Sequence, residues 1–109
     1  MKKSHIFINL KNKIKRKKNI VGIMGLGYVG LPLAMAFSLS KIKTIGYDIN
    51  KKRVALLKRK KSYLSSVSDD IIRKTYKNFD TTSNVEDLSK SDVIIICVPT
   101  PINDTTKIP

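Results

Sequence analysis

The sequence predicts an α/β fold in which parallel strands form an incomplete, doubly wound sheet. Two observations lead to this prediction. Short apolar runs rich in β-branched residues alternate along the chain with segments of helical character. A glycine-rich turn, Gly25–Gly30, joins the first apolar run to the helical segment that follows it. Strand–turn–helix units of this kind place successive strands parallel to one another.

The first half of the chain predicts two strands and two helices. Ile20–Met24 is a short apolar run typical of a strand, and the apolar residues after the turn predict a helix over Leu31–Leu39. Thr44–Asp48 is the second strand-like run. Asn50–Lys60 is predicted as a helix because its apolar residues recur at helical spacing.

The second half predicts two further helices and two further strands. Ser68 followed by two aspartates is typical of a helix start, because serine caps the first turn and acids favour its positive end. We then expect a short strand at Phe79–Thr82, a brief helix at Val85–Leu88 and a strand at Asp92–Val98. The last run is so apolar that we expect burial on both faces, although it would also form an exposed, aggregation-prone edge of the incomplete sheet.

The charge of the chain is concentrated at its N-terminus. The 109 residues include 22 Lys and Arg against 8 Asp and Glu, for a formal net charge of +14. Eight of the basic residues precede Asn19 and no acid does, so residues 19–109 carry a net charge of only +6. We interpret residues 1–18 as a basic extension of helical character and residues 19–109 as the N-terminal part of a cofactor-binding domain.

The composition limits the other classes of protein to consider. A single cysteine, Cys97, excludes an intramolecular disulfide, and no Cys/His cluster suggests a metal, so we expect a reducing, cytoplasmic setting. The alternatives are a membrane anchor at the uncharged segment Asn19–Ser40 and a basic peptide that binds nucleic acid or protein. Four glycines and Pro32 interrupt that segment, and Lys greatly outnumbers Arg, so we expect neither a membrane nor a nucleic acid as partner.

The glycine-rich turn has the spacing Gly25-x-Gly27-x-x-Gly30 between a strand and a helix. In a doubly wound Rossmann sheet of order 3-2-1-4, Gly25 allows the tight turn and Gly27 allows the backbone to approach a pyrophosphate. Gly30 lets the helix pack close to the sheet, and the free N–H groups at the helix start face the phosphates. The motif therefore predicts a dinucleotide site.

Asp48 lies 18 residues after Gly30, at the predicted end of the second strand. A carboxylate there can accept hydrogen bonds from the adenosine ribose hydroxyls and repels a 2′-phosphate, which favours NAD over NADP. The nearby cations Lys51, Lys52 and Arg53 leave NADP open as the alternative.

The loop Val98–Pro101 follows the fourth predicted strand. The first and fourth strands flank the point where the strand order reverses, and ligands bind beyond their carboxyl ends. We therefore expect the Thr100 hydroxyl to reach the cofactor crevice.

Several of these stretches together resemble one enzyme family. GLGYVGLPLA at 25–34, GYDIN at 46–50, Arg53-Val54 and VPTP at 98–101 are similar to the N-terminal NAD-binding domain of the UDP-glucose/GDP-mannose dehydrogenase family. The basic leader is similar to that of the branch that oxidises UDP-N-acetylhexosamines for surface polysaccharides. By this resemblance Tyr28 and Val29 line the pyrophosphate, Arg53 the adenosine side and Thr100 the nicotinamide half.

The resemblance also implies the reaction of the full-length enzyme. Family members transfer two hydrides to NAD and take a sugar C6 alcohol through an aldehyde to a carboxylate, with a catalytic cysteine in a later domain. We expect this chain to be a truncated part without the substrate and catalytic domains, inactive alone, and the full-length enzyme to be a homo-oligomer. Cys97 sits in the predicted apolar strand and is expected to be structural, so no catalytic residue is assigned.

Overall fold

The structure is a computed structural model that describes residues 19–97. Four parallel strands form one sheet in the order β3-β2-β1-β4, as the sequence predicts. The strands are Ile20–Met24 (β1), Lys43–Tyr47 (β2), Phe79–Thr82 (β3) and Val93–Ile96 (β4). The predicted N-terminal helix and the loop that carries Thr100 lie outside the described residues.

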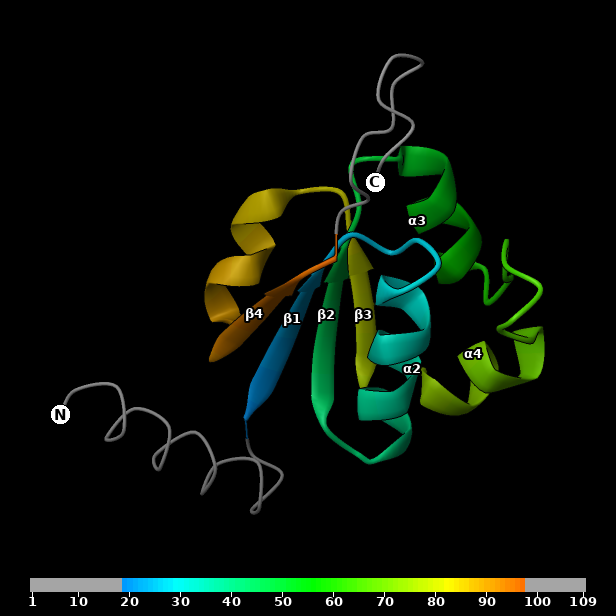
Figure 1. Cartoon of the computed structure of the whole chain (residues 1–109), viewed down its shortest axis with the longest axis horizontal. Helices are drawn as coiled ribbons and strands as arrows, with labels where there is room; N and C mark the ends of the chain where they lie inside the picture. Colours follow the sequence, from blue (N-terminus) through cyan, green and yellow to red (C-terminus); the bar gives the residue numbers. More distant parts are fainter. Residues whose placement is uncertain (1–18, 98–109) are drawn as a thin grey trace, which may run out of the picture.

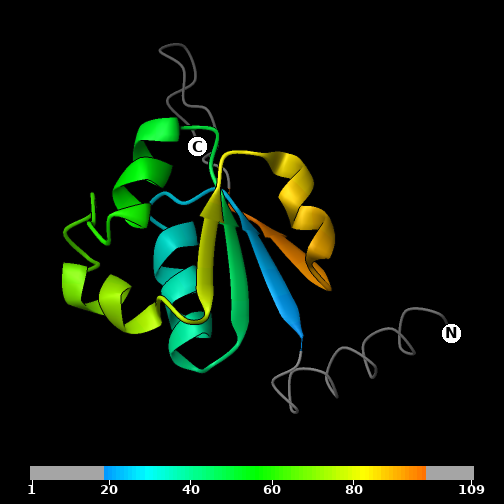
Figure 2. The same cartoon turned by 180° about the vertical axis from the view of Figure 1, so that it is seen from behind.

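Helices lie on both sides of the sheet. Gly30–Leu39 (α2), Lys51–Lys58 (α3) and Asp69–Thr75 (α4) lie on one side, and the 3-10 helix Val85–Lys90 (η1) lies on the other (Figures 1 and 2). The order of elements confirms the predicted alternation. The segment predicted as a brief helix at Val85–Leu88 is a 3-10 helix that extends to Lys90.

Capping side chains explain where α3 and α4 begin. The Asn50 side chain accepts hydrogen bonds from the backbone N–H groups of Lys52 and Arg53. The Ser68 hydroxyl accepts one from the N–H of Ile71, which confirms the predicted start of α4. These contacts satisfy N–H groups that have no partner within the helix.

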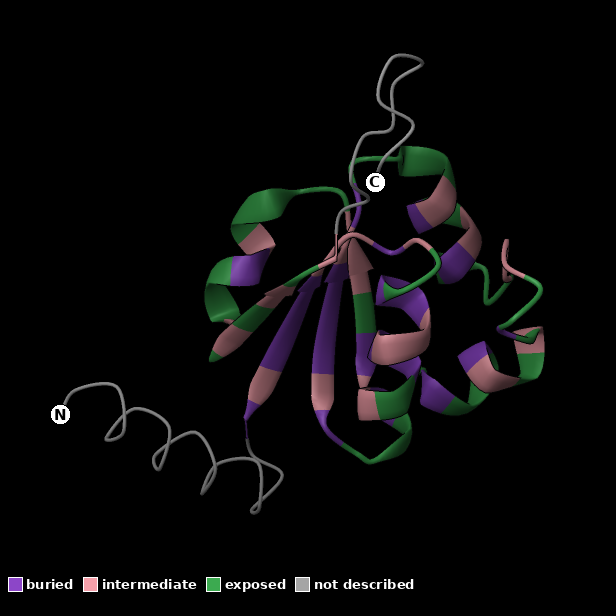
Figure 3. Ribbon diagram, viewed as in Figure 1, coloured by how far each residue is buried: buried purple, intermediate pink, exposed green. Residues whose placement is uncertain are grey.

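The core lies between the sheet and α2. Val21 and Ile23 on β1 face Leu31, Ala34 and other buried residues of one cluster. The middle residues of β1 and β2 are buried, as the purple ribbon in Figure 3 shows. The cluster fixes α2 against the two central strands, and this packing positions the turn that joins β1 to α2.

Strand β4 differs from the sequence prediction. It lies at the edge of the sheet, as expected, but it is not buried on both faces: Ile94 is 43% exposed and Ile96 is 66% exposed. Val93 and Ile95 point to the opposite face and pack against the core. Cys97 follows this strand and is partly buried. The prediction of two buried faces was wrong because, within residues 19–97, packing covers only one side of this edge strand.

The uncharged segment at 19–40 is not one helix. It divides into β1, a turn and the ten-residue helix α2. Within residues 19–97, no helix combines the length and the apolar character that crossing a bilayer requires.

Candidate cofactor site at the ends of β1 and β2

A pocket of about 430 Å³ opens where β1 and β2 end. It is lined by Met24, Gly25, Gly27, Tyr47, Asp48, Ile49, Asn50 and Arg53. The pocket lies beyond the carboxyl ends of parallel strands, where open α/β sheets bind their ligands. Four of the residues that the sequence predicts as cofactor ligands, from three separate segments, therefore line one cavity.

Gly25 and Gly30 shape the turn itself. Gly25 has a φ of 104°, a backbone conformation that residues with a side chain rarely adopt. Its N–H donates to the carbonyl of Tyr47 at 2.8 Å. A Cβ on Gly30 would lie 1.7 Å from the carbonyl oxygen of Gly25, so only glycine fits there. Both glycines are required by the fold, whether or not a ligand is bound.

Gly27 is different. Among residues 19–97, a Cβ built on it would meet only the Arg53 side chain, with Nη1 at an ordinary contact distance of 3.7 Å. No backbone atom of the described part of the chain forces glycine at this position, although the residue lines the pocket. The open space beside Gly27 fits the approach of a ligand group to the backbone, which is the role of this glycine in pyrophosphate binding.

The start of α2 also fits an anionic group. No side chain of the described residues caps it, and its first turn contains no acid. Val29 occupies the capping position, and the N–H of Leu31 donates to the carbonyl of Gly27 at 3.1 Å. The positive end of the helix dipole is therefore not neutralised by a side chain of the helix. Tyr28 and Val29 are exposed on the turn and do not line the pocket.

Asp48 is 5% exposed and is held by three donors. Its Oδ1 accepts from the N–H of Asn50 at 2.8 Å, and its Oδ2 accepts from the N–H of Leu26 at 2.9 Å and from Arg53 Nη1 at 3.3 Å. An ionised carboxylate offers about four acceptor sites. One site is left for a ribose hydroxyl, and displacement of Arg53 would provide a second.

Tyr63 is a residue of this region that sequence reasoning missed. Its hydroxyl donates to the carbonyl of Leu26 at 2.6 Å, and the Arg53 guanidinium carbon lies 5.3 Å from the centre of its ring. Burial raises the pKa of Tyr63 well above its usual value; Arg53 lowers that pKa and Asp48 raises it, both to a smaller extent. The hydroxyl therefore stays protonated and remains a donor at neutral pH. Tyr63 is 37 residues from Leu26, and no local pattern indicates their contact.

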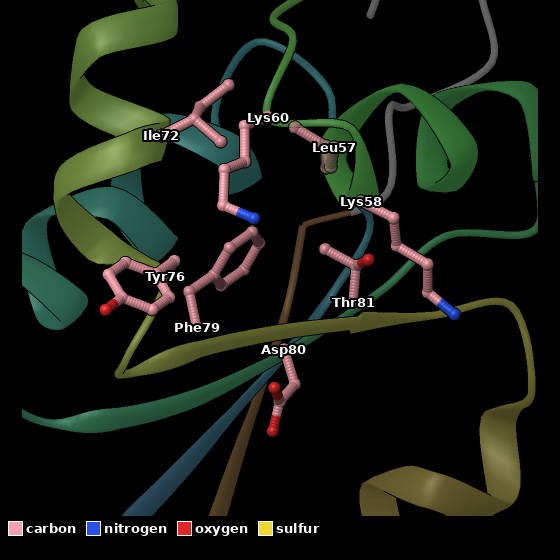
Figure 4. A pocket seen from close by; sticks show the side chains of 8 residues that line it. All are labelled: Leu57, Lys58, Lys60, Ile72, Tyr76, Phe79, Asp80 and Thr81. Atoms are coloured by element: carbon pink, nitrogen blue, oxygen red, sulfur yellow. The ribbon is translucent and has the colours of Figure 1, made fainter.

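A second pocket, of about 360 Å³, lies between α3, α4 and β3 (Figure 4). Leu57, Ile72 and Phe79 contribute its apolar lining, and Lys58 and Lys60 contribute cations. Lys60 Nζ lies 5.6 Å from the centre of the Tyr76 ring. None of the predicted cofactor residues within 19–97 lines this pocket, so it is separate from the described part of the candidate site.

The strand order, the glycine-rich turn and the pocket define a dinucleotide-binding domain of the Rossmann type. Residues 19–108 match the UDP-glucose/GDP-mannose dehydrogenase family, NAD binding domain. The chain belongs to this family, and the cofactor of the domain is NAD.

Individual relatives agree with this assignment. The chain is 46% identical over 87 residues to Protein CapL of Staphylococcus aureus, an alignment that covers 80% of this chain and 20% of the relative. It is 42% identical over 84 residues to a UDP-N-acetyl-D-glucosamine 6-dehydrogenase of Salmonella typhi, covering 76% of this chain and 19% of the relative. The chain thus spans about a fifth of the length of these curated relatives.

A solved structure of a related dehydrogenase has the same fold. The fold is similar to that of a UDP-D-ManNAc dehydrogenase from Pyrococcus horikoshii, with a TM-score of 0.71 and 32% sequence identity. The similarity covers 77% of this chain and 21% of that one.

Proposed function

We propose that this chain is the NAD-binding part of a nucleotide-sugar 6-dehydrogenase that oxidises the C6 alcohol of a UDP-N-acetylhexosamine to a carboxylate. The observation that carries the proposal is the pocket that joins the open space at Gly27 to the buried carboxylate of Asp48. The similarity to a UDP-N-acetyl-D-glucosamine 6-dehydrogenase supports the substrate class. NAD is the hydride acceptor in both oxidation steps.

The proposed roles of the turn residues rest on the glycine spacing and on the family resemblance, because only Gly25 and Gly27 among them line the pocket. The turn residues Gly25, Gly27, Tyr28, Val29 and Gly30 would hold the pyrophosphate at the start of α2. Free N–H groups and the helix dipole attract the phosphates there.

The remaining proposed contacts lie on either side of the pyrophosphate. Asp48 would accept a ribose hydroxyl and disfavour a 2′-phosphate, so NAD is preferred to NADP. Arg53 would lie on the adenosine side, and Thr100 would contact the nicotinamide half.

We also propose a cytoplasmic, homo-oligomeric enzyme that has neither a nucleic acid nor a membrane as partner. A single cysteine is consistent with a reducing compartment. The basic residues that remain after residue 18 are partly balanced by acids, which does not favour a nucleic-acid surface.

Calorimetric titration of the 109-residue chain with NAD and with NADP tests the cofactor assignment. We expect NAD to bind more tightly than NADP, and Asp48→Ala to weaken NAD binding by about tenfold, equivalent to one charge-assisted hydrogen bond of about 1.5 kcal/mol. The same substitution should narrow the difference between the two cofactors. Equal NAD affinity in Asp48→Ala would reject the role of the carboxylate.

The substrate class needs an assay of the protein encoded by the complete reading frame that contains this chain. We expect UDP-N-acetylglucosamine or UDP-N-acetylmannosamine to yield two NADH per sugar, since an alcohol is oxidised to a carboxylate. UDP-glucose is the matched comparison for UDP-N-acetylglucosamine, because it differs only by a hydroxyl in place of the acetamido group at C2. Preferential turnover of UDP-glucose would contradict the proposed branch while leaving NAD binding intact.

A further inference from the structure

Four residues form a closed ring of contacts beside the pocket. They come from four separate segments: the glycine-rich turn, the end of β2, helix α3 and the connection between α3 and α4. The ring runs from the Asp48 carboxylate to the Leu26 N–H, from the Leu26 carbonyl to the Tyr63 hydroxyl, and from the Tyr63 ring through Arg53 back to Asp48. Tyr63 is the one member that is neither in the turn nor a predicted cofactor ligand.

The ring holds the peptide groups on both sides of Leu26. The N–H of Leu26 donates to Asp48 Oδ2 at 2.9 Å, and its carbonyl accepts from the Tyr63 hydroxyl at 2.6 Å. The Leu26 side chain is fully buried. That carbonyl belongs to the peptide bond with Gly27, so the Tyr63 hydroxyl fixes the orientation of the peptide that leads into Gly27, which lines the pocket.

The ring also restrains Arg53. A long, partly exposed arginine side chain has many rotamers in the absence of fixed partners. Here its Nη1 lies 3.3 Å from Asp48 Oδ2, while its guanidinium lies over the Tyr63 ring. The same Nη1 is the atom nearest to the position of a Cβ on Gly27. The guanidinium is thus held between the proposed ribose ligand and the proposed pyrophosphate ligand.

We infer that Tyr63 is a positioning residue for the adenosine diphosphate half of NAD. Its ring holds the Arg53 guanidinium at the pocket, and its hydroxyl holds the Leu26–Gly27 peptide, although Tyr63 itself does not line the pocket. This inference rests on the proposed roles of Asp48, Arg53 and the turn. By this inference, cofactor affinity depends on a residue outside the glycine motif.

Two substitutions separate the two contacts of Tyr63. Tyr63→Phe keeps the ring under Arg53 and removes the hydroxyl, and we expect NAD affinity to fall about 2- to 10-fold, the range for one hydrogen bond. Tyr63→Leu removes the ring as well, and we expect a further loss of about 2- to 5-fold, the range for an exposed cation–π contact. Calorimetric titration with NAD and with ADP-ribose measures both losses, which should be equal because both ligands contain the adenosine diphosphate half.

The role of Arg53 is tested in an Arg53→Ala background. If the ring acts by holding Arg53, Tyr63→Phe and Tyr63→Leu should bind NAD equally in that background. A purely structural role of the ring would leave the difference between them unchanged. Thermal unfolding of each variant checks that the chain is folded at the temperature of the titration.

Tyr76 provides the matched control. It contacts Lys60 as Tyr63 contacts Arg53, but at the second pocket (Figure 4). Tyr76→Leu removes a cation–π contact of the same kind, and we expect NAD affinity to stay within about twofold of the wild type.

The outcomes distinguish this inference from the proposed function. If the wild-type chain binds no NAD, the proposed cofactor site fails first. If the wild-type chain binds NAD and both Tyr63 variants bind it as tightly as the wild type, the positioning role is overturned while the cofactor site stands. A ring contribution that persists without Arg53 also overturns the inference, because the ring would then act by another route.

Discussion

Helices α2 and α4 begin in opposite ways. The start of α4 is capped by the Ser68 hydroxyl and carries two aspartates in its first turn. The start of α2 has neither a capping side chain nor an acid, although α2 packs against the two central strands of the sheet. A helix start without a side-chain partner leaves N–H groups and positive potential available to another group.

The two helix starts differ because the residues at α4 satisfy the helix locally, whereas those at α2 leave its N–H groups available for binding. At α4 the local residues Ser68, Asp69 and Asp70 satisfy the start of the helix. At α2 the stability of the helix comes from its buried face, with Leu31, Ala34 and Met35 in the core. The start of α2 is therefore free to bind an anion, and in this NAD-binding domain it lies beside the pocket that contains Gly27 and Asp48.

The largest expected effect is that of Gly30→Ala at the start of α2. The new Cβ would overlap the carbonyl oxygen of Gly25, a backbone atom that cannot move aside without displacing the turn. We expect a loss of about 3 kcal/mol or more in the free energy of unfolding. Circular dichroism during thermal unfolding measures it.

Gly27→Ala is the matched substitution within the same motif. Its Cβ would have only an ordinary contact with Arg53, so we expect unfolding to change by less than about 1 kcal/mol while NAD affinity falls about tenfold. If both variants unfold like the wild type, the division between a structural and a binding glycine is wrong.

Val29→Asp makes the start of α2 resemble that of α4. Val29 is 67% exposed, so the fold tolerates the change, and an acid at this end of the helix adds about 0.3–1 kcal/mol of stability. The same charge repels a diphosphate, and we expect NAD affinity to fall on the order of 10-fold or more. Val29→Asn, which has nearly the same shape without the charge, is the control. A Val29→Asp chain that binds NAD as tightly as Val29→Asn would show that no phosphate lies at this helix start.

Ser68→Ala has the smallest expected effect, a loss of stability at the start of α4 alone. Loss of the capping hydroxyl leaves the N–H of Ile71 without that partner, and the free energy of unfolding should fall by about 1 kcal/mol. For a domain of this size that is a shift of about 4–8 °C in Tm. NAD affinity should not change, because α4 does not line the pocket. A parallel loss of NAD affinity would mean that the two helix starts are coupled.

Local features of the sequence determined most of the elements and the identity of the turn. Gly25, Asn50 and Ser68 each shape the turn or helix start in which they lie. Their position in the sequence therefore indicates where those elements begin. The alternation of elements indicated the parallel sheet, and the glycine motif indicated the Rossmann strand order; the structure confirms both.

Tertiary structure decided the features that depend on residues far apart in the chain. Strand β4 is apolar throughout, yet Ile94 and Ile96 are exposed because, within residues 19–97, packing covers only the opposite side of the strand, which composition cannot indicate. The contact of Tyr63 with Leu26, and the sharing of the Asp48 carboxylate among three donors, arise only when separate segments meet at the pocket. Periodicity and capping are short-range effects, whereas burial and long-range hydrogen bonds depend on how the whole chain packs.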